Sequence, residues 1–75
     1  MLELTTFNKR KNRWIINRPT TAEECERTVM IAYYLGWKLQ EIADDWGVSN
    51  GRIAQIMRRG ESRQKDLKIL LIDAS

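Results

Sequence analysis

The side chains best suited to chemistry are amides and guanidiniums in residues 49–58. Asn50 and Gln55 carry amides, which can form paired hydrogen bonds with adenine. Arg52 and Arg58 carry guanidiniums, which can form such pairs with guanine, and each good pair discriminates between bases by about 1–3 kcal/mol. These are the groups that read base-pair edges in DNA, although on their own they more often form the solvated face of a helix.

The charged residues are unevenly spread along the 75-residue chain, whose net charge is +3. Residues 1–18 carry five bases and one acid. Residues 19–51 carry two bases and six acids, and residues 52–68 carry six bases and two acids. Basic charge concentrated in two segments is typical of a protein that binds an anionic polymer, and the alternative is an ordinary solvated surface.

The composition disfavours several kinds of chemistry. The chain has no histidine and one cysteine, Cys25, so a histidine-activated thiol, a zinc site and a disulfide are not expected. The neighbouring carboxylates Asp44 and Asp45 would diverge by about 100° on a helix, so they do not form a catalytic pair. No glycine-rich phosphate-binding loop is present. We therefore expect a protein that is not an enzyme and that binds no metal or cofactor.

The same composition bears on the compartment. Cys25 is expected to be a reduced, small apolar residue within a helix, which favours a cytoplasmic protein. Glu3 and threonines stand where a signal peptide needs an apolar core. No apolar run approaches the roughly 20 residues that span a bilayer, so no membrane contact is expected.

A helix is predicted to begin after Pro19, which also favours an extended Arg18 before it. Thr20 or Thr21 can cap this helix, because a glutamate lies three residues after each of them. Gly36 is the expected stop. The apolar positions recur at three- and four-residue steps and predict one buried face, formed by Ala22, Cys25, Val29, Ala32 and Tyr33.

Two shorter helices are predicted over residues 39–46 and 50–59, with a sharp turn between them. Gly47 can take a positive φ in the turn, and Ser49 or the residue after it can cap the third helix. Gly60 is expected to end that helix. The residues expected to face inward from this unit are Leu39, Ile42, Ala43, Trp46, Val48, Ile53, Ile56 and Met57.

The pattern of small, apolar and turn residues over residues 39–56 resembles that of the helix-turn-helix family of bacterial and phage DNA-binding proteins. Glu41-Ile42-Ala43, the turn Gly47-Val48-Ser49 and the helix Gly51-Arg52-Ile53-Ala54-Gln55-Ile56 are similar to region 4 of sigma factors and to response-regulator output domains. The likeness covers residues 20–63 and includes no other part of a sigma factor, so recognition of promoter elements is not implied. It implies that the third helix enters the major groove.

The resemblance also implies a set of DNA contacts. The residues implied to face the bases are Ser49, Asn50, Gly51, Arg52, Ala54, Gln55 and Arg58. The residues expected to contact phosphates nearby are Lys38, Gln40, Arg59, Arg63, Lys65 and Lys68. A solvated side chain is the alternative for each of them. The basic residues near the N-terminus are expected in a minor groove or along phosphates, and the alternative is that they are disordered without a partner. These residues are Lys9, Arg10, Lys11 and Arg13.

Both ends of the chain admit two interpretations. In residues 1–18 the short apolar patch Trp14-Ile15-Ile16 is either a strand or an anchor onto the helices. Trp14 either packs onto the helices, which we expect, or contacts another protein. Residues 64–75 are predicted to form a helix that Ser62 caps, and a strand is the alternative. The apolar residues of this tail that are expected to contact a second copy or another partner are Leu67, Leu70 and Leu71.

The predicted fold is all-α: a compact bundle of three to four helices with a helix-turn-helix and an extended basic N-terminal arm. Residues 1–18 are the arm, residues 19–63 the helix-turn-helix domain and residues 64–75 the apolar C-terminal tail. Trp46 is expected in the core, and Trp37 is expected to be half-buried.

Together these features predict a sequence-specific double-stranded DNA-binding transcriptional regulator, such as a small phage or plasmid repressor that binds two half-sites as a homodimer. The alternative is a small phage factor that binds host RNA polymerase and modulates transcription through protein contacts. A third interpretation is the DNA-binding part of a packaging or recombination machine. In each case the expected location is the cytoplasm or nucleoid of a bacterial host.

Overall fold

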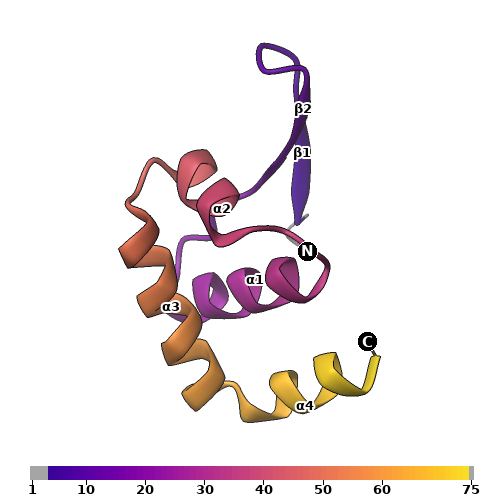
Figure 1. Cartoon of the computed structure of the whole chain (residues 1–75), viewed down its shortest axis with the longest axis vertical. Coiled ribbons are helices and arrows are strands. Elements are labelled where there is room, and N and C mark those ends of the chain that lie inside the picture. Colours follow the sequence, from indigo (N-terminus) through magenta and orange to yellow (C-terminus); the bar gives the residue numbers. More distant parts are fainter. Residues whose placement is uncertain (1–3, 75) are drawn as a thin grey trace.

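Four helices and two short strands make up the computed structural model, which describes residues 4–74. The start of the predicted arm, including Glu3, and Ser75 of the predicted tail lie outside the described residues. In chain order the elements are β1 (Thr5–Asn8), β2 (Arg13–Ile16), α1 (Ala22–Tyr34), α2 (Leu39–Trp46), α3 (Asn50–Arg63) and α4 (Lys65–Ala74) (Figure 1). The predicted helical fold is confirmed in its coarse form. Within the described range no helix has the length and apolar content needed to cross a bilayer.

The predicted extended arm is instead a β-hairpin, which confirms the strand alternative for Trp14-Ile15-Ile16. β1 and β2 pair antiparallel, with Thr5 opposite Ile16 and Phe7 opposite Trp14. β-branched and aromatic residues favour strands, and they are frequent in both segments. The polar residues between the strands make the turn, where Asn12 has a φ of 54°, a conformation that asparagine tolerates. The basic run is therefore the tip of a hairpin.

Two consecutive side chains hold the hairpin against the C-terminal end of α2. The Asp45 carboxylate accepts a hydrogen bond from the Ile16 amide at 3.0 Å and forms an ion pair with Arg13. The Trp46 ring donates its Nε1–H to the Ile16 carbonyl at 3.0 Å. Ile16 is itself buried, so the base of the hairpin is part of the core. The tip projects away from the helices (Figure 1).

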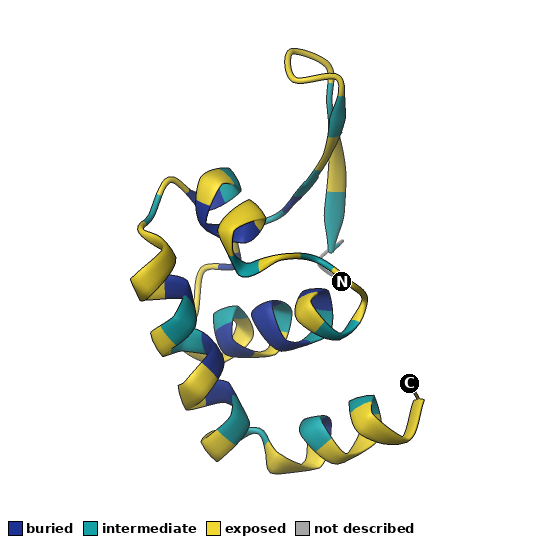
Figure 2. Cartoon of the chain, viewed as in Figure 1, coloured by how far each residue is buried: buried dark blue, intermediate teal, exposed yellow. Residues whose placement is uncertain are grey.

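The core lies where α1, α2 and α3 meet, and the buried residues of each helix face that region (Figure 2). The largest fully buried side chains are Ile16, Val29, Met30, Ile42 and Ile53. Trp46 is also buried and Trp37 is half-buried, as predicted for both. The helices therefore share one apolar core, and the hairpin contributes one residue to it.

α1 is capped by Thr21, as predicted, through a hydrogen bond from the amide three residues later to its hydroxyl at 3.2 Å. The buried face of α1 differs from the predicted one. Ala22 and Tyr33 are exposed, whereas Glu26 and Met30 are buried. The reason is that α3 packs against the side of α1 that carries Glu26 and Met30. The spacing of apolar residues along α1 does not indicate where another helix crosses it.

α2 and the turn after it match the prediction. Gly47 has a φ of 67°, and the Val48 amide donates to the Ala43 carbonyl at 3.0 Å. The Ser49 hydroxyl accepts a hydrogen bond from the Arg52 amide at 3.1 Å and so caps α3. α3 follows directly and packs against α2 and α1.

Gly60 does not end α3, contrary to the prediction, and the helix continues to Arg63. Gly60 is buried where α3 crosses α1. A Cβ atom at this position would lie 2.7 Å from Met30 Sδ and 3.2 Å from the Glu26 carbonyl oxygen. Glycine is therefore needed here for the close approach of two helices and not for a turn.

The predicted tail is a helix, α4, but Ser62 lies inside α3 and does not cap it. The chain bends at Gln64, whose φ and ψ are −107° and 52°. α4 then packs on α1 and α3 through Leu67, which is buried. Leu70, on the same helix, is exposed. α4 thus uses only part of its apolar surface in the fold.

Candidate nucleic-acid interface

The residues implied to read bases lie on the side of α3 that faces away from the core (Figure 2). Ile53, Met57 and Gly60 form the buried side of this helix. Among the implied base contacts Ala54 is half-buried, and the exposed ones are Ser49, Asn50, Gly51, Arg52, Gln55 and Arg58. We define the outer face of α3 as the exposed residues Asn50, Gly51, Arg52, Gln55, Arg58 and Arg59.

The outer face of α3 is cationic. Residues 50–60 include three arginines and no acidic residue. Glu61, which follows, is matched by Lys68 of α4, whose Nζ lies 3.0 Å from the Glu61 carboxylate. The hydrogen bond to Glu61 raises the pKa of Lys68. A polyanion that approaches this side of the molecule meets guanidiniums.

Arg52 and Gln55 are neighbours, one helical turn apart. Arg52 Nη1 donates to Gln55 Oε1 at 3.5 Å, a long distance for a hydrogen bond. Both side chains are exposed, so this contact is weak and easily replaced. The amide and the guanidinium are therefore available for paired hydrogen bonds. Ser49 differs, because its hydroxyl already caps α3.

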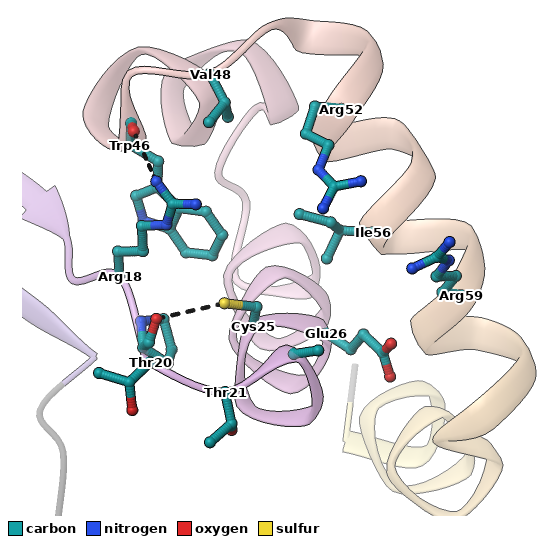
Figure 3. Close-up of a pocket in the computed structure, with 12 residues that line it drawn as sticks. Arg18, Thr20, Thr21, Cys25, Glu26, Trp46, Val48, Arg52, Ile56 and Arg59 are labelled. Atoms are coloured by element: carbon teal, nitrogen blue, oxygen red, sulfur yellow. Dashed lines mark hydrogen bonds between the residues drawn. The ribbon is translucent and has the colours of Figure 1, made fainter.

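A hollow of about 210 Å³ borders the outer face on the side of α1 (Figure 3). Arg52 and Arg59 line it from α3, and Arg18 lines it from the segment between β2 and α1. Arg18 Nη1 also donates to the Trp46 carbonyl at 3.4 Å. Three guanidiniums from two parts of the chain thus line one concave surface. The sequence did not reveal Arg18, because its local pattern indicates only an extended residue before Pro19.

Cys25 lies in the wall of the same hollow, with its Sγ 3.5 Å from the Pro19 carbonyl oxygen (Figure 3). Burial raises the pKa of the Cys25 thiol above its ordinary value. The thiol therefore stays protonated at neutral pH, and a protonated thiol is a poor nucleophile and a poor metal ligand. Nowhere in residues 4–74 do three cysteine or acidic side chains form a group that could hold a metal ion.

Glu26, also in the wall of the hollow, is only 3% exposed, which is rare for a carboxylate. Its Oε2 accepts a hydrogen bond from Arg63 Nη1 at 3.4 Å, and no partner for its Oε1 is found within the described part of the chain. The Arg63 side chain is itself 67% exposed. A buried carboxylate depends strongly on its charge partner, so Arg63 has a role in the fold besides the phosphate contact that the resemblance implies.

The other implied phosphate contacts fall into separate groups. Lys38 and Gln40 are exposed at the start of α2, at the end of that helix away from the turn. Lys65 is exposed at the start of α4. Residues 9–11 are exposed at the tip of the hairpin, which Figure 1 places well away from α3. The arginines of α3 lie beside the implied base contacts, and these other groups lie apart from them.

Arg13 has an internal partner. Its guanidinium pairs with Asp45, whose side chain is fully buried, and donates to the Trp14 carbonyl at 3.2 Å. The two ends of the ion pair are 32 residues apart in the chain, so no local pattern could indicate it. Arg13 thus anchors the hairpin, and its charge is matched before any phosphate approaches.

Of the residues expected to contact a protein partner, Trp14 and Leu70 are exposed. Trp14 is 57% exposed, so the expected packing of this ring onto the helices is wrong, because the hairpin carries it beyond them. Leu70 is 67% exposed. The other implied contacts are buried or half-buried: Ile15, Ile16, Leu67 and Leu71.

Comparison with known proteins adds no evidence on this surface. No family model, curated protein or solved structure gives a significant match to the chain. The function of the chain is therefore inferred from its side chains and their arrangement.

Proposed function

We propose that this chain is a sequence-specific double-stranded DNA-binding transcriptional regulator, in which α2, the turn and α3 form a helix-turn-helix. The observation that carries the proposal is the outer face of α3. It presents exposed amide and guanidinium groups without an acidic residue, on a helix whose other side is in the core. The major groove of B-DNA is about 12 Å wide and admits an α-helix, so such a face can reach base edges there.

Each side chain of this region has a role in the proposal. Asn50 and Gln55 supply amides for adenine, and Arg52 and Arg58 supply guanidiniums for guanine. Gly51 leaves open space at the start of α3, because no atom lies within 4 Å of the position that a Cβ would occupy. The helix start can therefore come close to the bases.

Phosphate contacts hold such a helix in register on the duplex. Arg59 on α3 and Arg18 across the hollow carry the charge for these contacts beside the groove. Arg63 adds a guanidinium at the end of α3, and Lys65 adds an ammonium at the start of α4. Each phosphate that they neutralise should add about −0.9 to the slope of log affinity against log salt concentration.

A second candidate is a small phage factor that binds host RNA polymerase and modulates transcription through protein contacts. Exposed apolar surface favours it, since Ile69, Leu70 and Ile72 of α4 are 58%, 67% and 49% exposed. Three such residues on one short helix indicate a contact surface more strongly than scattered ones do. The same surface would serve a homodimer on two half-sites in the first proposal.

Binding of duplex DNA by variants of the outer face tests the proposal. Arg52→Ala and Gln55→Ala should each weaken binding to a preferred site by about 1–3 kcal/mol, or about fivefold to a hundredfold. Arg27→Ala is the matched control, because Arg27 is exposed on α1 and lies outside the outer face. It should leave binding almost unchanged.

Two results would count against this reading of α3. One is duplex binding that neither Arg52→Ala nor Gln55→Ala weakens. The other is an equal loss in all three variants, which would indicate an effect of charge or folding alone. Retention on RNA polymerase that survives both changes in α3 and is lost in Leu70→Glu would favour the second candidate.

A further inference from the structure

Two aromatic rings are exposed on the hairpin. Phe7 and Trp14 lie directly opposite each other in the β1–β2 register, with ring centroids 5.5 Å apart in an edge-to-face contact. Phe7 is 43% exposed and Trp14 is 57% exposed. Ile16, two residues further along β2 and nearer the helices, is buried, so the rings lie on the part of the hairpin beyond the core. The contact between the rings leaves ring surface open for another flat group.

The charged residues of the hairpin, residues 5–16, are all basic. Residues 4–18 carry five basic residues and no acidic residue. Residues 9–11, all basic, are exposed at the tip just beyond the rings, whereas Arg13 is matched by Asp45. A suitable partner therefore offers flat apolar groups together with negative charge. Nucleic acids combine the two.

The exposed ring surface also distinguishes single strands from duplexes. In a duplex each base is stacked between its neighbours, and its edges are what the grooves present. A ring on the hairpin meets the face of a base where the bases are unstacked, as they are in a single strand. We propose that the hairpin binds single-stranded nucleic acid, with unpaired bases stacked on Trp14 and Phe7 and phosphates at residues 9–11. This site goes beyond the duplex reading proposed for α3 and shares no residue with it.

The hairpin is held in position without a ligand. Asp45 and Trp46 fix its base through hydrogen bonds of 3.0 Å to the Ile16 amide and carbonyl. At the tip the Lys11 amide donates to Asn8 Oδ1 at 3.1 Å and orders the turn. Rings that are already positioned lose little conformational freedom when a base stacks on them, so more of the stacking energy contributes to affinity.

Fluorescence anisotropy of a short dye-labelled oligothymidylate, titrated with the chain, tests this proposal. Trp14→Leu removes the ring and keeps an apolar side chain beside Phe7. Tyr33→Leu is the matched control, because Tyr33 is 47% exposed and also forms an edge-to-face contact, with Tyr34 at 5.8 Å, but lies on α1. Thermal unfolding of both variants establishes that each retains the fold.

We expect the unmodified chain to bind the labelled oligothymidylate and to raise its anisotropy. Trp14→Leu should weaken its binding about fivefold to a hundredfold, the range for loss of one stacked base. Tyr33→Leu should bind oligothymidylate as the unmodified chain does.

No binding of oligothymidylate by the unmodified chain would overturn the proposal, as would equal binding by the Trp14→Leu and Tyr33→Leu variants. The test is independent of α3. Arg52→Ala should bind oligothymidylate normally while it loses duplex affinity, so a failure of one proposal can be told from a failure of the other.

Discussion

At Gly60 the backbone of α3 lies against Met30, whose side chain is fully buried in α1. An added methyl group would meet Met30 Sδ at 2.7 Å and the Glu26 carbonyl oxygen at 3.2 Å. Met30 is closely surrounded, so the helices must shift to make room. Gly60→Ala should therefore destabilise the fold by about 1–3 kcal/mol, measured as the free energy of unfolding in urea.

Gly51 provides the control for this change within the same helix. No atom lies within 4 Å of a Cβ added at Gly51, and alanine is a better helix former than glycine by up to about 1 kcal/mol. Gly51→Ala should therefore maintain or raise stability. Equal stability of the two variants would show that α1 and α3 do not approach each other as closely at Gly60 as described.

The positions of some residues of the candidate site could be predicted from the sequence, and those of others could not. The exposure of Gln55 and Arg58 could be predicted, because the helical period decides which positions point outward. The place of Arg18 in the same hollow as Arg52 could not, because it depends on how α1 and α3 pack. The role of Arg13 depends on Asp45 in another element in the same way.

Among the elements, α2 and the turn after it were predictable because their signals are local. Gly47 supplies the positive φ and Ser49 supplies the cap of α3, each within a few residues of the feature that it makes. The hairpin was not predictable on the same grounds. An isolated two-stranded hairpin is at best marginally stable in water, and this one depends on Asp45 and Trp46, which lie far along the chain.

Removing the Asp45 carboxylate should therefore release the hairpin from α2. In Asp45→Ala the Ile16 amide and the Arg13 guanidinium lose their partner, and an unsatisfied buried group costs about 1–3 kcal/mol. Hydrogen exchange should become faster at the amides of β1 and β2. Asp44→Ala is the control, because Asp44 is exposed on the same helix. If the strand amides exchange equally slowly in both variants, Asp45 is not the anchor.

At the scale of the whole molecule, the exposed apolar residues of α4 lie outside both proposed nucleic-acid surfaces. If α4 forms the homodimer, Leu70→Glu should abolish self-association and leave the fold intact, since Leu70 is 67% exposed. Leu35→Glu is the matched control, because Leu35 is 66% exposed and lies at the end of α1. Sedimentation at several protein concentrations, with and without DNA, measures this. A monomer under all these conditions would rule out the dimer.

Selection of bound sequences from random duplex DNA tests the central claim most directly, because it asks whether the chain reads base sequence at all. The unmodified chain should enrich a defined motif. Gln55→Ala should enrich the same motif with the preference lost at one adenine position, since the amide that pairs with adenine is gone. A pool that stays random with the unmodified chain, or a motif that is identical for the two proteins, would contradict the reading of DNA by α3.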